Sequence, residues 1–154
     1  MFTLPARSGP RPNVRQTTPH QQLDQLAPVH LQQALAARVF ALPDVVEHES
    51  LVSVPGARAL CLRQEVPAGA PEAFIAAREF AHLHPHYDGS LHIRLPPALA
   101  QEALDKGWAE PHFLVHSGHL PGHYVMLYGP RDEAELDIIY GMIEASYHWA
   151  GGRS

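Results

Sequence analysis

Residues 80–95 read FAHLHPHYDGSLHIRL, and this stretch decides the fold. Polar and apolar residues alternate along both of its halves, which is the period-two pattern of a β-strand with one buried face. The two halves meet at Asp88-Gly89, a dipeptide typical of tight turns. The stretch therefore predicts an antiparallel β-hairpin, and four of the 12 histidines in the chain lie within it.

The register of this hairpin follows from keeping its polar side chains on one face. Pairing His84 with Ser90 places His82 opposite His92, with Phe80 expected on the same face. A shift by one residue would mix polar with apolar side chains, which a sheet with one buried face resists. Directly opposed side chains have Cβ atoms about 4.5–5.5 Å apart. The imidazoles of His82, His84 and His92 are therefore expected to converge on one patch.

Three interpretations of this patch stay open. Three imidazoles, joined by a carboxylate or by His112, can hold zinc, iron or copper, although the spacing H-x-H-x7-H is no specific signature. Alternatively, neighbouring imidazoles lower one another's affinity for protons and form a metal-free acid–base site. In the third interpretation the histidines are solvated or hydrogen-bonded groups on an exposed sheet face. We favour the acid–base interpretation, because the spacing is no specific metal signature and the shared face argues against a purely structural role.

These considerations give a set of candidate site residues. The candidate catalytic residues are His82, His84, Asp88, His92 and His112. The candidate substrate contacts are Trp108, Tyr87 and Arg94. No cofactor is predicted, but a divalent metal, if present, would be bound by His82, His84 and His92.

The remaining sequence alternates helical and strand patterns. Helical periodicity is expected over 28–42, 97–106 and 132–149, with Asp132 as the N-cap of the last helix. Strand patterns are expected at 51–54, 57–63, 80–84, 90–95 and 124–128. These elements predict an α+β fold: a single antiparallel sheet of four to five strands packed against an N-terminal helix, a middle helix and a long C-terminal helix.

Composition limits the class of protein. The chain has 154 residues, 45% of them hydrophobic and 18% charged, and a net charge of −5, so we expect one globular domain without a surface for nucleic acid or anionic membranes. No apolar run reaches the roughly 20 residues that cross a bilayer, and no signal peptide is recognisable. The lone Cys61 fits a reducing compartment. We therefore expect a cytoplasmic protein.

The first residues differ from the rest. Residues 1–20 contain four prolines and few large apolar side chains, which predicts a flexible Pro-rich leader. The single α+β domain is then expected over residues 21–150.

The segments REFAHLHPHYDGSLHIRL, ALDKGWAEPH and YVMLYGPRDEAELDIIYGMIEASYHWA resemble the fungal luciferase family. The resemblance covers roughly residues 78–149, about half of the chain, and the combined pattern is more specific than any single piece. It identifies the domain at 21–150 as luciferase-like and the chain as similar to bacterial luciferase-domain proteins. The residues that fall on the shared motif are His82, His84, Asp88, Ser90, His92, Gly107, Trp108 and His112.

The resemblance also implies a chemistry. Fungal luciferases use O2 to oxidise a hydroxylated styryl-pyrone and emit light without a flavin. For this chain it implies a flavin-independent, monooxygenase-like oxidoreductase that uses O2 as co-substrate on a small aromatic or enolic substrate. The alternative is a non-catalytic module that binds a metal or a small molecule. A small-molecule substrate is the expected partner, and homodimer formation is left open.

Overall fold

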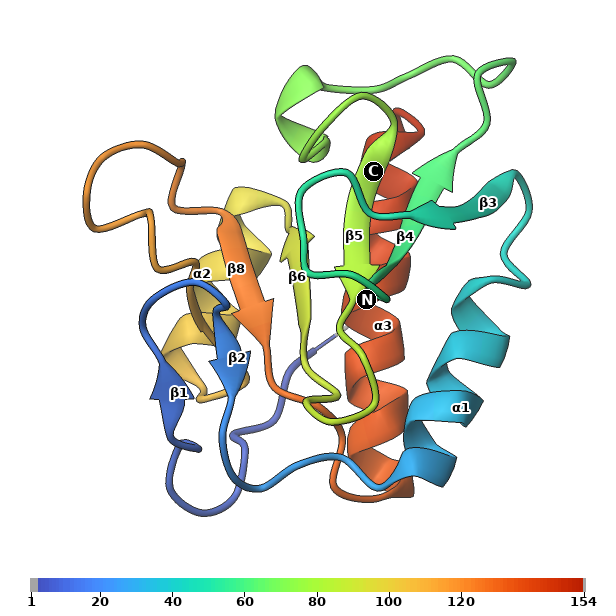
Figure 1. Ribbon diagram of the computed structural model, residues 1–154. Helices are drawn as coiled ribbons and strands as arrows, with labels where there is room; N and C mark the ends of the chain where they lie inside the picture. The colour runs from blue at the N-terminus through green and yellow to red at the C-terminus, as the bar shows by residue number, and fades with distance from the viewer. Residues whose placement is uncertain (1–2, 154) are drawn as a thin grey trace.

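The computed structural model describes residues 3–153 and shows an α+β fold. Within this range, three α-helices accompany a six-stranded antiparallel sheet of strand order β3-β4-β5-β6-β8-β7 and a separate two-stranded sheet of β1 and β2 (Figure 1). The main sheet comprises β3 (Val45–Glu49), β4 (Arg58–Leu62), β5 (Glu79–Leu83), β6 (Leu91–Arg94), β7 (Ala109–Pro111) and β8 (Tyr124–Leu127). The expected class is confirmed, but the expected strand number of four to five is too low.

Two strands account for the difference in number and position. β7 has only three residues, too few to show a period-two pattern, and was not expected. The strand expected at 51–54 lies instead at Val45–Glu49. Its sequence, VVEHE, ends in three polar residues that are exposed in the structure, so it lacks the apolar alternation of a half-buried strand. Residues 51–54 form the loop to β4, and Leu51 is 78% exposed there.

The helices cover one face of the main sheet. They are α1 (Val29–Val39), α2 (Pro97–Asp105) and α3 (Glu133–Ala150), and a short 3-10 helix covers Pro71–Ala73. Asp132 caps α3 as expected, because its side chain accepts a hydrogen bond from the Glu135 backbone N–H. Ile139, Met142 and Ile143 of α3 are buried in the core against the sheet. No helix within residues 3–153 has the length and apolarity needed to cross a membrane.

Strand β5 contains a β-bulge that reverses its side-chain alternation. Leu60 of β4 pairs with Ala81, whereas the next residue, Cys61, pairs with Glu79, so Phe80 is the extra residue. The expectation that Phe80 shares a face with His82 is therefore wrong. Its ring lies 6.4 Å from that of Tyr147 in α3, centroid to centroid, in the hydrophobic core. Glu79 takes its place on the histidine face.

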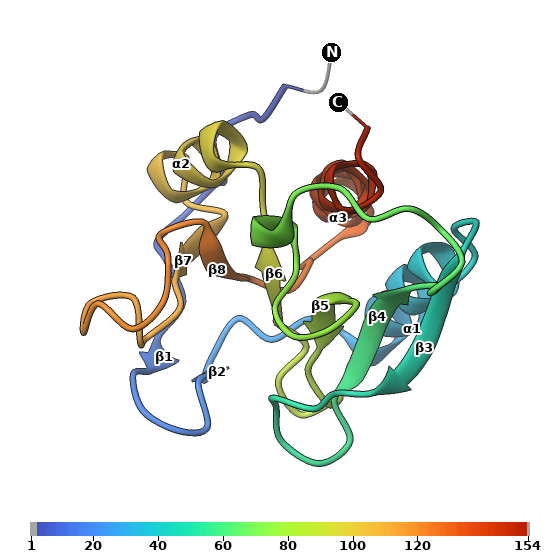
Figure 2. The same ribbon diagram turned by 90° about the horizontal axis from the view of Figure 1, so that it is seen from above.

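The N-terminal segment does not extend away from the domain, which corrects the expectation of a free, flexible leader. Leu4, Arg7 and His20 are all buried. β1 (Val14–Arg15) pairs with β2 (Gln21–Gln22). Figure 2 shows these strands on the opposite side of the main sheet from α2 and α3. Leu4 and Arg7 thus pack next to α2, with Leu4 in the hydrophobic core, whereas His20 contacts the histidine face of the sheet.

The bulge assignment can be tested by truncating Phe80. Phe80→Ala removes a fully buried ring from the core, so we expect the free energy of unfolding to fall by about 3–5 kcal/mol. Leu51→Ala, at an exposed apolar position, is the control and should change it by less than about 0.5 kcal/mol. Urea unfolding monitored by circular dichroism measures both. Equal small effects would place Phe80 on the solvent side and contradict the bulge.

Candidate functional site

The histidine hairpin adopts the predicted register. His82 pairs with His92 across β5 and β6, and the His84 backbone N–H donates to the Ser90 carbonyl oxygen at 3.0 Å. The exposed fractions of His82, His84 and His92 are 0%, 7% and 5%. The patch is therefore buried, and the interpretation of the three histidines as a solvated surface group is corrected. Buried imidazoles need hydrogen-bond partners, which identifies the groups that matter next.

Two buried carboxylates hold the outer nitrogens of this cluster. Nδ1 of His82 lies 2.7 Å from Oε2 of Glu79, and Nδ1 of His84 lies 2.5 Å from Oδ2 of Asp88. Ser50 donates its hydroxyl to Glu79 at 2.9 Å, and the Ser90 hydroxyl donates to Asp88 at 2.7 Å. An ionised carboxylate only accepts, so both imidazoles carry their proton on Nδ1 and present the Nε2 lone pair inward.

His92 lies at the centre of the cluster. Its Nδ1 is 3.1 Å from Nε2 of His82 and 3.0 Å from Nε2 of His84. Its Nε2 is 2.9 Å from Nδ1 of His20. Both nitrogens of His92 therefore face other imidazoles, and within residues 3–153 no carboxylate hydrogen-bonds to this ring.

Sequence reasoning missed two residues of the site, His20 and Glu79. His20 comes from the segment expected to be a leader, and its Nε2 lies 3.4 Å from Oε2 of Glu110. No local pattern marked it, because its contact with His92 spans 72 residues. Glu79 reaches the site only through the bulge at Phe80, which simple alternation does not foresee.

His112 joins the cluster from the loop after β7. Its ring centroid lies 4.6 Å from that of His92, and the ring stacks on Tyr124 at 4.6 Å with an interplanar angle of 20°. Its Nδ1 accepts the Leu114 backbone N–H at 3.2 Å. In the neutral ring the proton is therefore on Nε2.

Burial lowers the pKa of three histidines of the cluster. Removal from water lowers the pKa of His82 and, more strongly, that of His92, whose histidine neighbours lower it further. Burial and the neighbouring histidines lower the pKa of His112 to about 4. The rings of His82, His92 and His112 are therefore neutral near pH 7.

A cavity of about 440 Å³ opens onto the cluster. His20, His84, His92 and His112 all contribute to its lining. Its wall and mouth are apolar and aromatic, formed by Val52, Tyr87, Phe113 and Leu114. Tyr87, Val52 and Leu114 are at least one-third exposed, which leaves the mouth open to an incoming ligand.

The other predicted substrate contacts lie elsewhere. Trp108 is 3% exposed within the hydrophobic core, and its indole N–H donates to the Pro5 carbonyl oxygen at 2.7 Å, so it does not line the cavity. Arg94 contacts Tyr124, with its guanidinium 5.0 Å from the centroid of that ring, and does not line the cavity. Of the three predicted contacts, only Tyr87 reaches the cavity.

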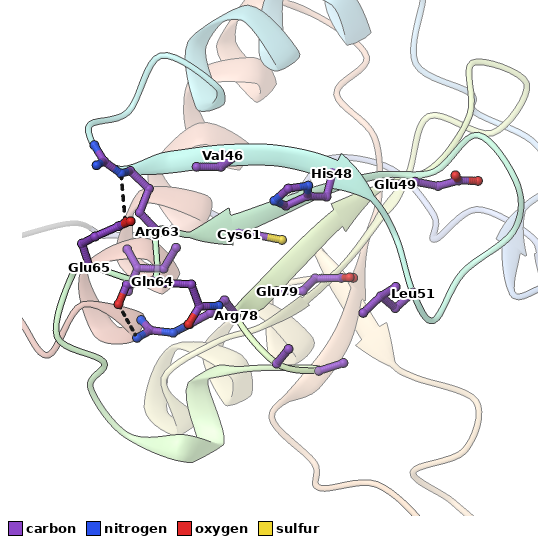
Figure 3. Close-up of a pocket in the computed structure, with 13 residues that line it drawn as sticks. Val46, His48, Glu49, Leu51, Cys61, Arg63, Gln64, Glu65, Arg78 and Glu79 are labelled. Atoms are coloured by element: carbon purple, nitrogen blue, oxygen red, sulfur yellow. Dashed lines mark hydrogen bonds and ion pairs between the residues drawn. The ribbon is translucent and has the colours of Figure 1, made fainter.

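Figure 3 shows a second cavity of about 610 Å³ on the same face of the sheet. Val46 of β3, Cys61 of β4 and Glu79 of β5 contribute to its lining. Burial raises the pKa of the Cys61 thiol to about 11, so this thiol is not a nucleophile at neutral pH. Glu79 lies between this cavity and His82, which places one carboxylate at the back of the histidine cluster.

Comparison with known proteins assigns the family. Residues 77–146 match the Luciferase domain family. The chain is 32% identical to luciferases of Armillaria gallica and Armillaria mellea over 93% of its length, and 39% identical to that of Neonothopanus nambi over 45% of it. The chain belongs to a fungal luciferase-like family. The matched region contains the whole histidine hairpin and His112.

The similarity to the Armillaria luciferases extends beyond residues 77–146 of this chain but covers only part of the length of those proteins. The chain spans 59% of the length of the Armillaria luciferases and 27% of the length of the Neonothopanus protein. The alignment with the Armillaria luciferases covers nearly all of this chain. No solved structure matches the chain significantly.

The lowered pKa values predict how stability depends on pH. The unfolded chain takes up protons on these histidines below about pH 6.5, whereas the folded protein does so only at lower pH. The free energy of unfolding should therefore fall as pH drops from 6.5 towards about 4, the pKa of His112. Urea titrations of chelator-treated protein at pH 7.5, 6.0 and 5.0 measure this.

A variant identifies the source of the pH dependence. His112→Asn removes one titrating group and should flatten the profile, whereas the control His86→Asn, at an exposed position of the same hairpin, should leave it unchanged. A profile for the parent protein that is flat between pH 7.5 and 5.0 would contradict the account.

Proposed function

We propose that this protein is a flavin-independent oxidoreductase that uses O2 to oxidise a small aromatic or enolic substrate. One observation carries the proposal: four imidazoles from three parts of the chain line one cavity whose mouth is aromatic and apolar. Membership of a luciferase family supports the oxidoreductase class. The roles of the individual residues are derived below from their positions.

The cavity suits a flat substrate with an acidic hydroxyl group. Tyr87 and Phe113 supply aromatic surface at the mouth, and the histidine end supplies the polar groups. A ring held between them would direct its hydroxyl towards His84 and His92. This separation of an apolar mouth from a polar base fixes the orientation of the substrate before reaction.

The first chemical step is loss of the substrate proton. The histidine cluster accepts the hydroxyl proton through an inward imidazole lone pair, and the substrate becomes an enolate or phenolate. His112 remains neutral and carries its proton on Nε2, so it can donate a hydrogen bond to the developing negative charge. Asp88 orients His84 for this step through its hydrogen bond to Nδ1.

The second step is oxidation of that anion. The electron-rich carbon of the enolate forms a bond to one atom of O2, so the substrate carbon is oxidised and O2 is reduced to the peroxide level. The proton held by the histidine cluster then passes to the outer oxygen, giving a hydroperoxide. Electrons for O2 come from the substrate, so no flavin is required.

Oxygen uptake tests this proposal. Protein supplied with a hydroxylated styryl-pyrone, or with simpler hydroxy-pyrones and catechols, should consume O2 with no added flavin. His84→Ala removes a proton acceptor and should lower kcat/KM by at least about 100-fold. Tyr87→Ala removes part of the apolar wall and should raise KM with a smaller effect on kcat.

A matched control uses the exposed histidine of the same hairpin. His86→Ala should retain the turnover of the parent protein, because His86 does not line the cavity. Unchanged turnover in both His84→Ala and His92→Ala would contradict a role for the cluster, whatever the substrate.

A further inference from the structure

Two acceptor nitrogens at the centre of the histidine cluster compete for a single possible donor. Nε2 of His82 and Nε2 of His84 present lone pairs, because their Nδ1 protons go to Glu79 and Asp88. Both lone pairs face the same atom, Nδ1 of His92, at 3.1 and 3.0 Å. One N–H at that atom can serve only one of them well.

Placing the His92 proton on Nδ1 also creates a conflict on the other side of the ring. Nε2 of His92 would then be a lone pair facing Nδ1 of His20, which must carry a proton to bond with it. Nε2 of a neutral His20 would then have a lone pair directed at the Glu110 carboxylate, 3.4 Å away. Two acceptors would face each other with no hydrogen between them.

The other tautomer of His92, with its proton on Nε2, gives every outer nitrogen of the cluster a hydrogen-bond partner. Nε2–H of His92 donates to Nδ1 of His20, and Nε2–H of His20 points to Glu110. Glu110 also accepts from the Tyr128 hydroxyl at 2.9 Å and from the Gln16 amide at 2.7 Å. Three inner lone pairs, on His82, His84 and His92, then converge with no proton among them.

Three converging imidazole lone pairs are the donor set of a metal ion. One nitrogen from each of the three rings lies within 4.8 Å of the other two. Two nitrogens bound to one ion at about 2.1 Å are about 3.0 Å apart at an octahedral angle and about 3.4 Å apart at a tetrahedral angle. The distances of 3.0 and 3.1 Å to Nδ1 of His92 fall in or next to this range.

The surrounding groups match those that support metal-bound histidines. Such ligands donate their outer N–H to a carboxylate, which fixes the ring and strengthens its lone pair. Glu79 and Asp88 do this directly for two of the rings, and Glu110 does it through His20 for the third.

The two buried carboxylates beside the cluster also favour a bound cation. Glu79 and Asp88 are 2% and 1% exposed, and within residues 3–153 neither forms an ion pair with a lysine or an arginine; their nitrogen partners are His82 and His84. Buried carboxylates without a cation are costly. A dication among neutral imidazoles balances both of them.

We infer that His82, His84 and His92 bind one divalent transition-metal ion of the iron, copper or zinc type, through Nε2, Nε2 and Nδ1 respectively. Three protein ligands leave coordination positions open, and two of the ligands, His84 and His92, line the cavity. The site therefore has the composition of a reactive centre, since a purely structural zinc site is closed by four protein ligands.

This inference rests on the donor set alone. It describes the metal-bound form of the site, whereas the proton transfer under the proposed function describes the metal-free cluster. With the ion bound, the inner nitrogens no longer accept protons. The positive charge then stabilises the substrate anion in the cavity, and His20 and His112 remain as imidazoles on the cavity wall. A protein that binds metal but oxidises nothing, or one that oxidises without metal, would separate the two proposals.

Cobalt(II) is the probe for the test. Full-length protein made without a histidine tag and treated with chelator is titrated with Co²⁺, followed by visible absorption and by elemental analysis after gel filtration. We expect one Co²⁺ per chain with the spectrum of nitrogen ligation. Absence of stoichiometric binding in the parent protein would overturn the inference.

Variants locate the site and keep the test independent of folding. His84→Ala should weaken binding at least 10-fold, and the conservative changes Glu79→Gln and Asp88→Asn, which retain a hydrogen-bond acceptor, should weaken it about 10- to 100-fold. His86→Ala is the control and should bind as the parent does. Retained affinity in the Glu79→Gln and Asp88→Asn variants with native circular dichroism would contradict the supporting role of the carboxylates and overturn the inference.

A second trio of histidines gives a competing outcome. His20, His92 and His112 also present one nitrogen each within 4.8 Å of the others. Loss of Co²⁺ in His112→Ala with full retention in His84→Ala would place the ion there and overturn the assignment. Loss in His84→Ala with retention in His112→Ala supports it.

Discussion

The hydrogen bonds from two buried imidazoles to two buried carboxylates fix the geometry on which the site depends. Glu79 and Asp88 hold the outer nitrogens of His82 and His84, so the inner nitrogens turn towards His92. These bonds exist because a bulge in β5 and a turn after it bring acidic residues to the histidine face. The helices on the other face of the sheet supply the hydrophobic core, which leaves this face free for polar groups.

The sequence predicts the part of this arrangement that local periodicity controls. Alternation around Asp88-Gly89 places His82 opposite His92, and the structure confirms this pairing. Asp132 at the start of α3 is likewise a local signal, because a cap acts within one helical turn. Burial of the histidine face, by contrast, depends on what covers the sheet, and alternation alone does not contain that information.

The parts that could not be predicted are non-local or break the alternation. His20 reaches His92 across 72 residues, from a proline-rich stretch whose composition favours disorder. Glu79 joins the cluster because Phe80 is the extra residue of a bulge, which shifts the pattern by one position. Trp108 was predicted as a substrate contact, but it is a core side chain whose indole N–H donates a hydrogen bond to the Pro5 carbonyl oxygen.

The central claim is that His82 and His84 present their Nε2 lone pairs to the centre of the cluster. Long-range nitrogen–proton NMR of the imidazoles in chelator-treated protein observes the position of each ring proton directly. The account predicts that His82 and His84 carry their proton on Nδ1, with Nε2 unprotonated. Protons found on Nε2 of both rings would contradict it.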